Sequence, residues 1–155
     1  MGWWSATIMG GDTPLDLEAK IYAMLGIEMY TKKTDKKRKI PKAKFEKEQN
    51  RVVKEILNLE EGWDSTTVGM QVLGTMMMEV GAKMSDNNKK LILNGAKNDE
   101  WAKTSSERKE YIKAFISTVK SYNNKPTIID YESLGEVFSK HSGSGLINKN
   151  VKKPA

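Results

Sequence analysis

The chain has 155 residues and no cysteine, which excludes disulfides, thiolate metal sites and cysteine nucleophiles. Hydrophobic residues make up 38% of the sequence and charged residues 30%, a composition that is polar but still typical of one folded domain. The formal net charge is +6 at pH 7, and it is distributed unevenly along the sequence.

Apolar residues recur every three or four positions over much of the sequence, as in amphipathic helices. This spacing predicts six helices, at about residues 13–25, 42–61, 66–84, 85–96, 105–122 and 131–141. We therefore expect an all-α, mainly helical fold, a single irregular domain over residues 1–141. We expect a short extended segment at residues 1–12 and another at 127–129. Residues 31–41 are expected to form a solvated loop, and residues 142–155 a flexible basic tail.

Particular residues mark the ends of these helices. The segments TPLD at 13–16 and TSSE at 104–107 have the form of a capping box, with the leading threonine as N-cap. Ser85 is expected to cap the fourth helix, and Gly26 to end the first.

The helix predicted at 66–84 contains several glycines and methionines. Each glycine lowers helix propensity by about 1 kcal/mol, but small residues let another helix approach closely. The glycines are Gly69, Gly74 and Gly81. The methionines favour a place in the core, the alternative being an adaptable surface for a partner. They are Met70, Met76, Met77, Met78 and Met84.

Residues 31–54, which we call the basic arm, hold eleven Lys or Arg and three acidic residues, a charge of +8. The other 131 residues together carry −2. The arm is interpreted either as solvated surface or as a site for anions, with these candidate residues: Lys32, Lys33, Lys36, Lys37, Arg38, Lys39, Lys42 and Lys44.

An anionic partner of the arm could be nucleic acid, an anionic nucleotide or an acidic protein. Residues 31–44 contain no aromatic residue, Tyr30 lying just before them, and neither a helix-turn-helix spacing nor an RNA-binding aromatic motif is present. Any nucleic-acid binding is therefore expected to be non-specific.

No catalytic constellation is recognised. The sole histidine, His141, adjoins the SGSG segment, and no Walker loop or dinucleotide fingerprint is present. The carboxylates Asp12 and Asp16, or a cluster of Glu60, Glu61 and Asp64, could hold a metal for hydrolysis, but acids at the start of a helix are also expected from the helix dipole. We expect no enzyme, no catalytic residue, no metal and no cofactor.

The N-terminus is the second candidate site for a partner, formed by Trp3, Trp4, Asp12 and Asp16. The tryptophans are interpreted as core anchors or as a stacking surface. Removal of the initiator methionine would leave an α-amine on Gly2, which could pair with either aspartate.

Met1-Gly2, Trp4, Asp12 and Asp16 resemble an uncharacterised bacterial family that opens Met-Gly-x-Trp and carries Asn-Asp-x-Ala-x-Asp at this offset. The resemblance covers about the first 17 residues. This sequence departs from the pattern at Ser5, Thr7, Gly11 and Pro14. Because family members are small accessory proteins of bacteria and phages with no established reaction, the resemblance implies an interaction role.

These features favour a non-enzymatic protein that binds a protein partner, of the accessory, immunity or counter-defence type. The alternative is a binder of anionic nucleotide or nucleic acid through residues 31–54 with Trp3 and Trp4, and an Asp-dependent metal hydrolase ranks third. No stretch has the about 20 apolar residues of a membrane span, and no basic region precedes an apolar stretch as in a secretory signal. We expect a cytoplasmic protein with no membrane partner.

Overall fold

The computed structural model describes residues 5–30, 36–60, 63–129 and 148–150. The helices there are α1 (Asp12–Met24), α2 (Lys42–Leu57), α3 (Trp63–Val80), α4 (Asp86–Lys97) and α5 (Ser106–Ser121), with a 3-10 turn, η1 (Trp101–Lys103). The prediction of a mainly helical chain is confirmed. The sixth predicted helix, at 131–141, lies outside the described residues. No helix in the described ranges combines the length and the apolar character needed to cross a membrane.

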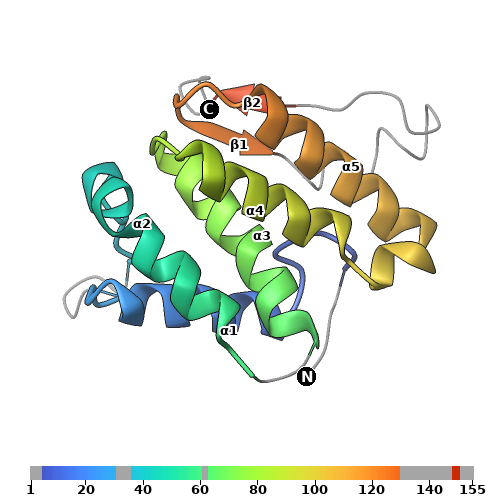
Figure 1. Ribbon diagram of the computed structural model, residues 1–155, viewed down its shortest axis with the longest axis horizontal. Helices are drawn as coiled ribbons and strands as arrows, with labels where there is room; N and C mark the ends of the chain where they lie inside the picture. Colours follow the sequence, from blue (N-terminus) through green and yellow to red (C-terminus); the bar gives the residue numbers. More distant parts are fainter. Residues whose placement is uncertain (1–4, 31–35, 61–62, 130–147, 151–155) are drawn as a thin grey trace.

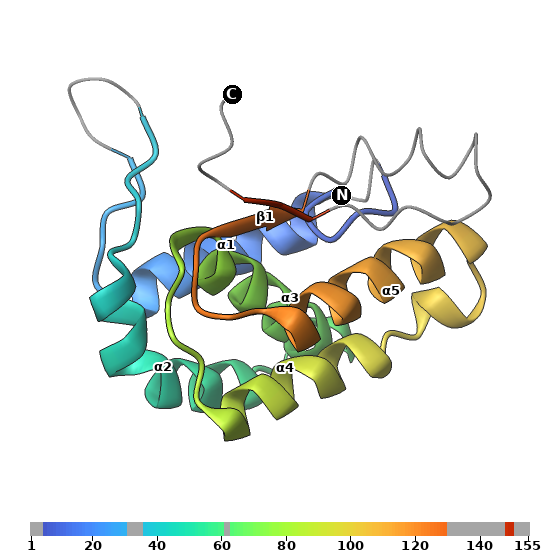
Figure 2. The same ribbon diagram turned by 90° about the horizontal axis from the view of Figure 1, so that it is seen from above.

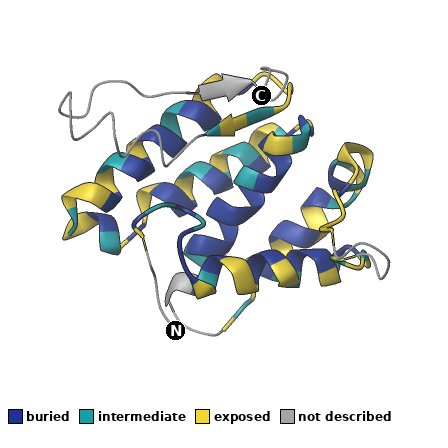
Figure 3. Cartoon of the chain, turned by 180° about the vertical axis from the view of Figure 1, so that it is seen from behind, coloured by how far each residue is buried: buried dark blue, intermediate teal, exposed yellow. Residues whose placement is uncertain are grey.

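Helix α3 occupies the centre of the fold (Figure 1). Figure 2 shows α1 and the strand β1 (Thr127–Ile129) on one side of α3, and α4 on the opposite side. Helix α3 is buried along most of its length, whereas α2 and α5 alternate between buried and exposed faces (Figure 3). The apolar residues that pack on α3 therefore come from every other α-helix of the described ranges.

Glycines on α3 allow its neighbours to pack close to its backbone, as predicted. A Cβ atom on Gly69 would lie 2.7 Å from Cγ2 of Ile56 on α2. A Cβ on Gly74 would lie 2.8 Å from Cγ2 of Ile92 on α4 and 3.0 Å from Cζ of Phe115 on α5. The low helix propensity of glycine is thus offset by close packing with three helices.

The methionines of this region belong to the core. Five of them are at most 6% exposed: Met70, Met76, Met77, Met78 and Met84. Their unbranched side chains fill the irregular spaces between helices that cross α3 in different directions.

Two predicted N-caps are displaced. Helix α1 begins at Asp12 with Gly11 as N-cap, and not with Thr13 as N-cap, because Gly11 is extended and Asp12 then lies in the first turn, where a negative charge is favourable. Helix α5 has Ser105 as N-cap in place of Thr104, since the Ser105 hydroxyl accepts a hydrogen bond from the backbone N–H of Arg108 at 3.1 Å. Ser85 caps α4 as predicted.

Two helices end before their predicted limits. Helix α3 stops at Val80 and not at Met84, because Gly81 takes a positive φ of 74° and the ring of Pro126 packs against it. Helix α2 stops at Leu57, four residues before its predicted end. The prediction that Gly26 follows the first helix is confirmed, with a φ of 69°.

The extended piece predicted at 127–129 is confirmed as β1, which pairs antiparallel with β2 (Asn148–Asn150). Ile128 stands opposite Lys149 in this ribbon. The partner strand belongs to the segment predicted as a flexible tail, whose remaining residues lie outside the described ranges.

A buried ion pair connects α3, α5 and the chain that follows α4. The side chains of Arg108 and Asp99 are 0% and 1% exposed, and Nη2 of Arg108 lies 2.8 Å from Oδ2 of Asp99. The same guanidinium nitrogen donates to Oε1 of Gln71, whose amide in turn donates to Asp99 at 3.0 Å. Burial alone would raise the pKa of Asp99, but the hydrogen bonds from Arg108 and Gln71 lower it below its ordinary value.

The other side of the same guanidinium holds the N-terminal segment. Nη1 of Arg108 donates to the backbone carbonyls of Ala6 at 3.2 Å and Thr7 at 2.9 Å. Ile8 follows directly and is fully buried in the core, while the ring centroid of Trp101 lies 4.8 Å from Cζ of Arg108. Residues 5–9 form bends and turns, so the extended segment predicted before the first helix is not confirmed, and a side chain about a hundred positions away in the sequence holds these residues.

Replacing Arg108 with Ala would leave a buried carboxylate without its cation, so we expect the free energy of unfolding to fall by about 3–5 kcal/mol. The exposed pair Lys103–Glu100, at 2.9 Å, provides a matched control, since Lys103→Ala should cost less than about 1 kcal/mol. Urea unfolding followed by circular dichroism measures both. A loss for Arg108→Ala no larger than that of the control would contradict this role.

The same pair makes stability depend on pH. The pKa of Asp99 is lower in the folded chain than the value of about 3.9 in unfolded chains. Its contribution is therefore complete above that value and is lost as the pH falls through the folded-state pKa. The difference in stability between the wild type and Asp99→Asn should shrink in acid.

Gly74→Ala should destabilise the fold by about 1–3 kcal/mol, because the added methyl group would press on both Ile92 and Phe115. Asn94→Ala, at an exposed position of α4, is the control and should leave the melting temperature unchanged or slightly raised. Thermal unfolding compares the two variants. Equal melting temperatures would show that the helices yield around this position without cost.

Candidate functional site

Residues 36–40 of the basic arm are attached to the body of the fold at two points. Residues Tyr30 and Lys37 form an antiparallel bridge, and the N–H of Arg38 donates to the carbonyl of Met29 at 2.7 Å. Ile40 is 2% exposed and belongs to the core. Of the predicted solvated loop, residues 36–39 are exposed and lie outside any helix or strand, whereas Ile40 is buried and attaches the segment to the body. Residues 31–35 lie outside the described ranges.

Two basic residues of the arm serve the fold itself. Nζ of Lys37 lies 2.8 Å from Oε2 of Glu18, a buried carboxylate on α1. Burial alone would lower the pKa of Lys37, but its hydrogen bond to Glu18 raises it above the ordinary value. Arg51 pairs with Glu48 on its own helix and donates to the carbonyl of Met24 at 2.7 Å, so it joins α2 to the end of α1.

The other described basic residues of the arm face solvent with weak or no neutralisation. We define the cationic face by five exposed residues: Arg38, Lys39, Lys42, Lys47 and Lys54. Arg38 lies 3.9 Å from Glu28, and no described acidic side chain lies within 4 Å of the four lysines. Helix α2 also has no acidic residue in its first turn and no side-chain N-cap. The four lysines are therefore exposed cations without a described ion pair.

Two further predicted anion-binding residues are described near this face. Lys36 is exposed and has an interaction of its own within the chain, whereas Lys44 is half-buried in the first turn of α2. Lys32 and Lys33 lie outside the described residues. The structure brings the described members together along the arm and α2.

The N-terminal candidate site is described only in part. Asp12 and Asp16 are exposed, one turn apart at the start of α1, and Asp12 has an interaction within the chain. Trp3, Trp4 and the amine predicted on Gly2 lie outside the described residues. Within the described ranges, no three His, Cys, Asp or Glu side chains gather as a metal site would require. His141 and the side chain of Asp64 are not described.

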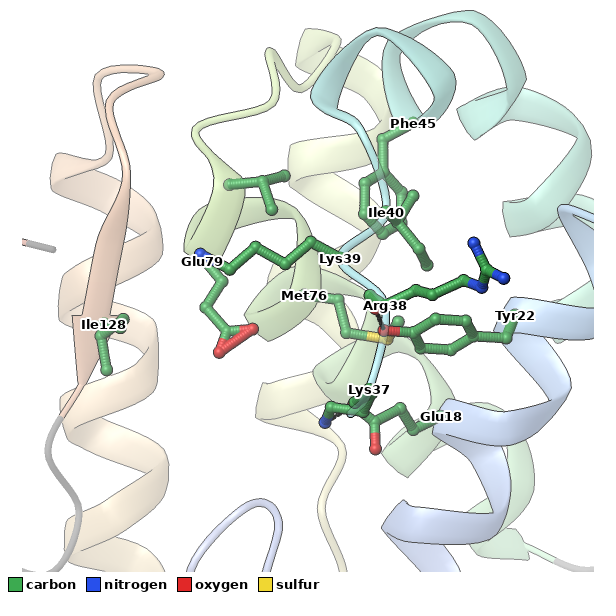
Figure 4. Close-up of a pocket in the computed structure, with 11 residues that line it drawn as sticks. Glu18, Tyr22, Lys37, Arg38, Lys39, Ile40, Phe45, Met76, Glu79 and Ile128 are labelled. Atoms are coloured by element: carbon green, nitrogen blue, oxygen red, sulfur yellow. Dashed lines mark hydrogen bonds and ion pairs between the residues drawn. The ribbon is translucent and has the colours of Figure 1, made fainter. Parts of the chain in front are cut away.

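A cavity of about 250 Å³ opens beside the cationic face (Figure 4). Its apolar walls come from α1, the arm, α2, α3 and β1: Tyr22, Ile40, Phe45, Met76, Val80 and Ile128. Its charged lining is Glu18, Lys37, Arg38, Lys39 and Glu79. Sequence patterns did not reveal this cavity, because each of its segments looks like ordinary core or surface when taken alone.

The carboxyl group of Glu79 gives the cavity its distinct electrostatics. Figure 4 shows Glu79 and Ile128 on one side of the opening, and Lys37 with Glu18 on another. Burial raises the pKa of Glu79, the positive charge of Lys37 opposes this rise, and Glu18 adds to it. No hydrogen bond or ion pair reaches Glu79 from the described residues. The cavity thus presents, beside its apolar walls, a carboxyl group that Lys37 and Lys39 attract without a described hydrogen bond or ion pair.

Comparisons with protein-family models, with curated proteins and with solved structures found no match to this chain. The resemblance of the first 17 residues to the Met-Gly-x-Trp family therefore stays a prediction.

Lys37→Met should raise the pKa of Glu79 further, because it removes the positive charge that favours the ionised carboxylate. The matched control is Lys90→Met on α4, which lines no part of the cavity and should leave this pKa unchanged. Carbon-detected NMR titration of the side-chain carboxyl groups measures both. A wild-type pKa for Glu79 at or below the usual value of about 4.3 would contradict the described environment.

Proposed function

We propose that the protein is a non-enzymatic interaction protein that binds an acidic surface of a protein partner through its cationic face. The observation that carries this proposal is that Lys39, Lys42, Lys47 and Lys54 are all exposed and have no described acidic neighbour within 4 Å. Elsewhere in the described chain, Lys103 and Lys113 have such neighbours in Glu100 and Glu110, whereas Lys90, Lys97 and Lys109 do not, so the arm differs from the rest of the surface in its local excess of basic residues.

The position of these charges on α2 supports the proposal. Lys42 and Lys44 lie in the first turn, where the helix dipole is positive and cations are unfavourable. An anionic partner would relieve this repulsion, and opposite charges on two surfaces also accelerate their encounter. The arrangement costs the free protein some stability and favours the bound state.

A protein partner suits this surface better than nucleic acid does. The cationic face adjoins a cavity with apolar walls, which apolar side chains of a protein would fill. Tyr30 is 55% exposed and is one ring available beside the arm, whereas single-stranded nucleic acids are usually held on several stacked rings. Non-specific nucleic-acid binding through the lysines alone is the second candidate function.

The cellular location and the biological role that we propose are inferred from the sequence. The absence of cysteine is consistent with the reducing cytoplasm, the location we propose. The resemblance of the N-terminal residues to a family of small bacterial and phage proteins supports an accessory, immunity or counter-defence role.

Replacing Lys39, Lys42 and Lys47 with Ser should weaken binding of labelled poly-glutamate about tenfold or more at 50 mM salt, since it removes three unneutralised charges. The control variant carries Ser in place of Lys90, Lys97 and Lys109, which are equally exposed on α4 and α5. It has the same net charge, so only the position of the charges differs. Fluorescence anisotropy measures binding for all three proteins.

A labelled single-stranded oligonucleotide is titrated in parallel. Strong oligonucleotide binding that falls steeply with salt, together with no binding of poly-glutamate, would overturn the proposal in favour of the second candidate. Equal losses in the two triple variants would also overturn it, because attraction would then follow net charge and not the cationic face.

A further inference from the structure

The cavity and the cationic face share residues. Lys39 and Arg38 belong to both, and their side chains extend in different directions from the same stretch of the arm (Figure 4). Between them, Ile40 and Tyr22 contribute to the apolar wall. A partner segment lying along the arm would therefore meet a positive charge, an apolar opening and a second positive charge in succession.

The size of the cavity limits what it could receive. Its volume of about 250 Å³ is below the roughly 300–1,000 Å³ of sites that enclose drug-sized ligands. One aromatic or large aliphatic side chain is of the right size. Most of its wall is apolar, so such a side chain would leave water for a surface formed by aliphatic, aromatic and thioether groups.

We propose that this cavity receives one aromatic or large aliphatic side chain from an acidic segment of the partner, while the flanking carboxylates pair with Lys39 and Arg38. The inference rests on the proposed function and specifies the chemistry of the partner. We infer this occupant from charge complementarity, because Lys39 and Arg38 line the cavity together with its apolar residues.

Glu79 gives the site its selectivity. Its carboxyl group faces the cavity and has no described hydrogen bond or ion pair within 4 Å, although the charges of Lys37 and Lys39 attract it, so an acidic side chain entering the cavity would meet a like charge. Acidic residues of the partner would therefore bind favourably beside the cavity, at Lys39 and Arg38, and unfavourably within it, against Glu79. This combination fixes the register of the partner segment, because a shift by one residue would place a carboxylate against Glu79.

The test uses two fluorescein-labelled peptides and the full chain. In one peptide a central Phe has three acidic residues on each side, and in the other Gly replaces the Phe. We expect the Phe peptide to bind about tenfold or more tightly, because only its ring fills the cavity. Ile128→Ala should reduce this preference severalfold, since Ile128 forms a wall of the cavity and is 40% exposed.

Leu57→Ala is the matched control for Ile128→Ala. Leu57 is 44% exposed on α2 and lines no part of the cavity, so its replacement should leave the preference for Phe unchanged. Glu79→Gln should allow a third peptide, with Glu at the central position, to bind more tightly than it binds the wild type. Leu57 is exposed and Glu79 makes no described hydrogen bond or ion pair, so we expect both variants to retain the folded state.

The outcomes separate the two proposals. Equal binding of the Phe and Gly peptides, both weakened by the triple Ser variant of the arm, would overturn the cavity proposal and leave the proposed function intact. No binding of either peptide would overturn both. Self-association of the protein that Ile128→Ala reverses would assign the cavity to a second copy of the chain. Weaker binding of the Glu-centred peptide to Glu79→Gln would show that Glu79 attracts the ligand, and would overturn the selectivity argued here.

Discussion

The guanidinium group of Arg108 lies where α3, α5, the turn after α4 and the N-terminal segment meet, and it is fully removed from water. A charge in such a place is stable only when its hydrogen-bonding groups are satisfied, and here Asp99, Gln71 and two backbone carbonyls accept from it. These acceptors come from separate parts of the chain, so the pair fixes their relative positions. The N-terminal segment, which then leads into α1, depends on this junction, and α1 in turn supports the basic arm through Glu18.

Much of the helical fold follows from patterns that act over short distances. Apolar spacing located all five described α-helices, and Ser85 and Gly26 stand where local hydrogen bonding requires them. The predictions failed where contacts between residues distant in sequence determine the end of a helix or the burial of a side chain. Pro126 lies some 45 positions from Gly81 in the sequence, and its ring packs against Gly81 where α3 ends. No local sequence pattern shows this contact. Likewise, Arg108 looked like an ordinary charged residue of a helix start, and its burial depends on partners in three other segments.

The candidate site was predictable in its charge and not in its shape. The sequence located the basic arm, because charge is a property of composition. It did not distinguish Lys37 and Arg51, which stabilise the fold, from Lys39 and Lys42, which face solvent without a described acidic neighbour. That distinction depends on Glu18 and on the end of α1, both remote in sequence. The cavity could not be predicted from the sequence, because its wall combines side chains from five elements that only the tertiary fold brings together.

The hydrogen bonds from Arg108 to the carbonyls of Ala6 and Thr7 also bear on how the chain reaches its native state during synthesis. Sequence separations of 102 and 101 residues make these among the longest-range contacts in the described chain, and such contacts slow folding because a large loop must close. On the ribosome, the N-terminal segment emerges first but cannot dock until most of the chain, including the start of α5, has followed. Ile8 and the apolar face of α1 therefore stay exposed during most of translation, a period in which chaperones would have access to them.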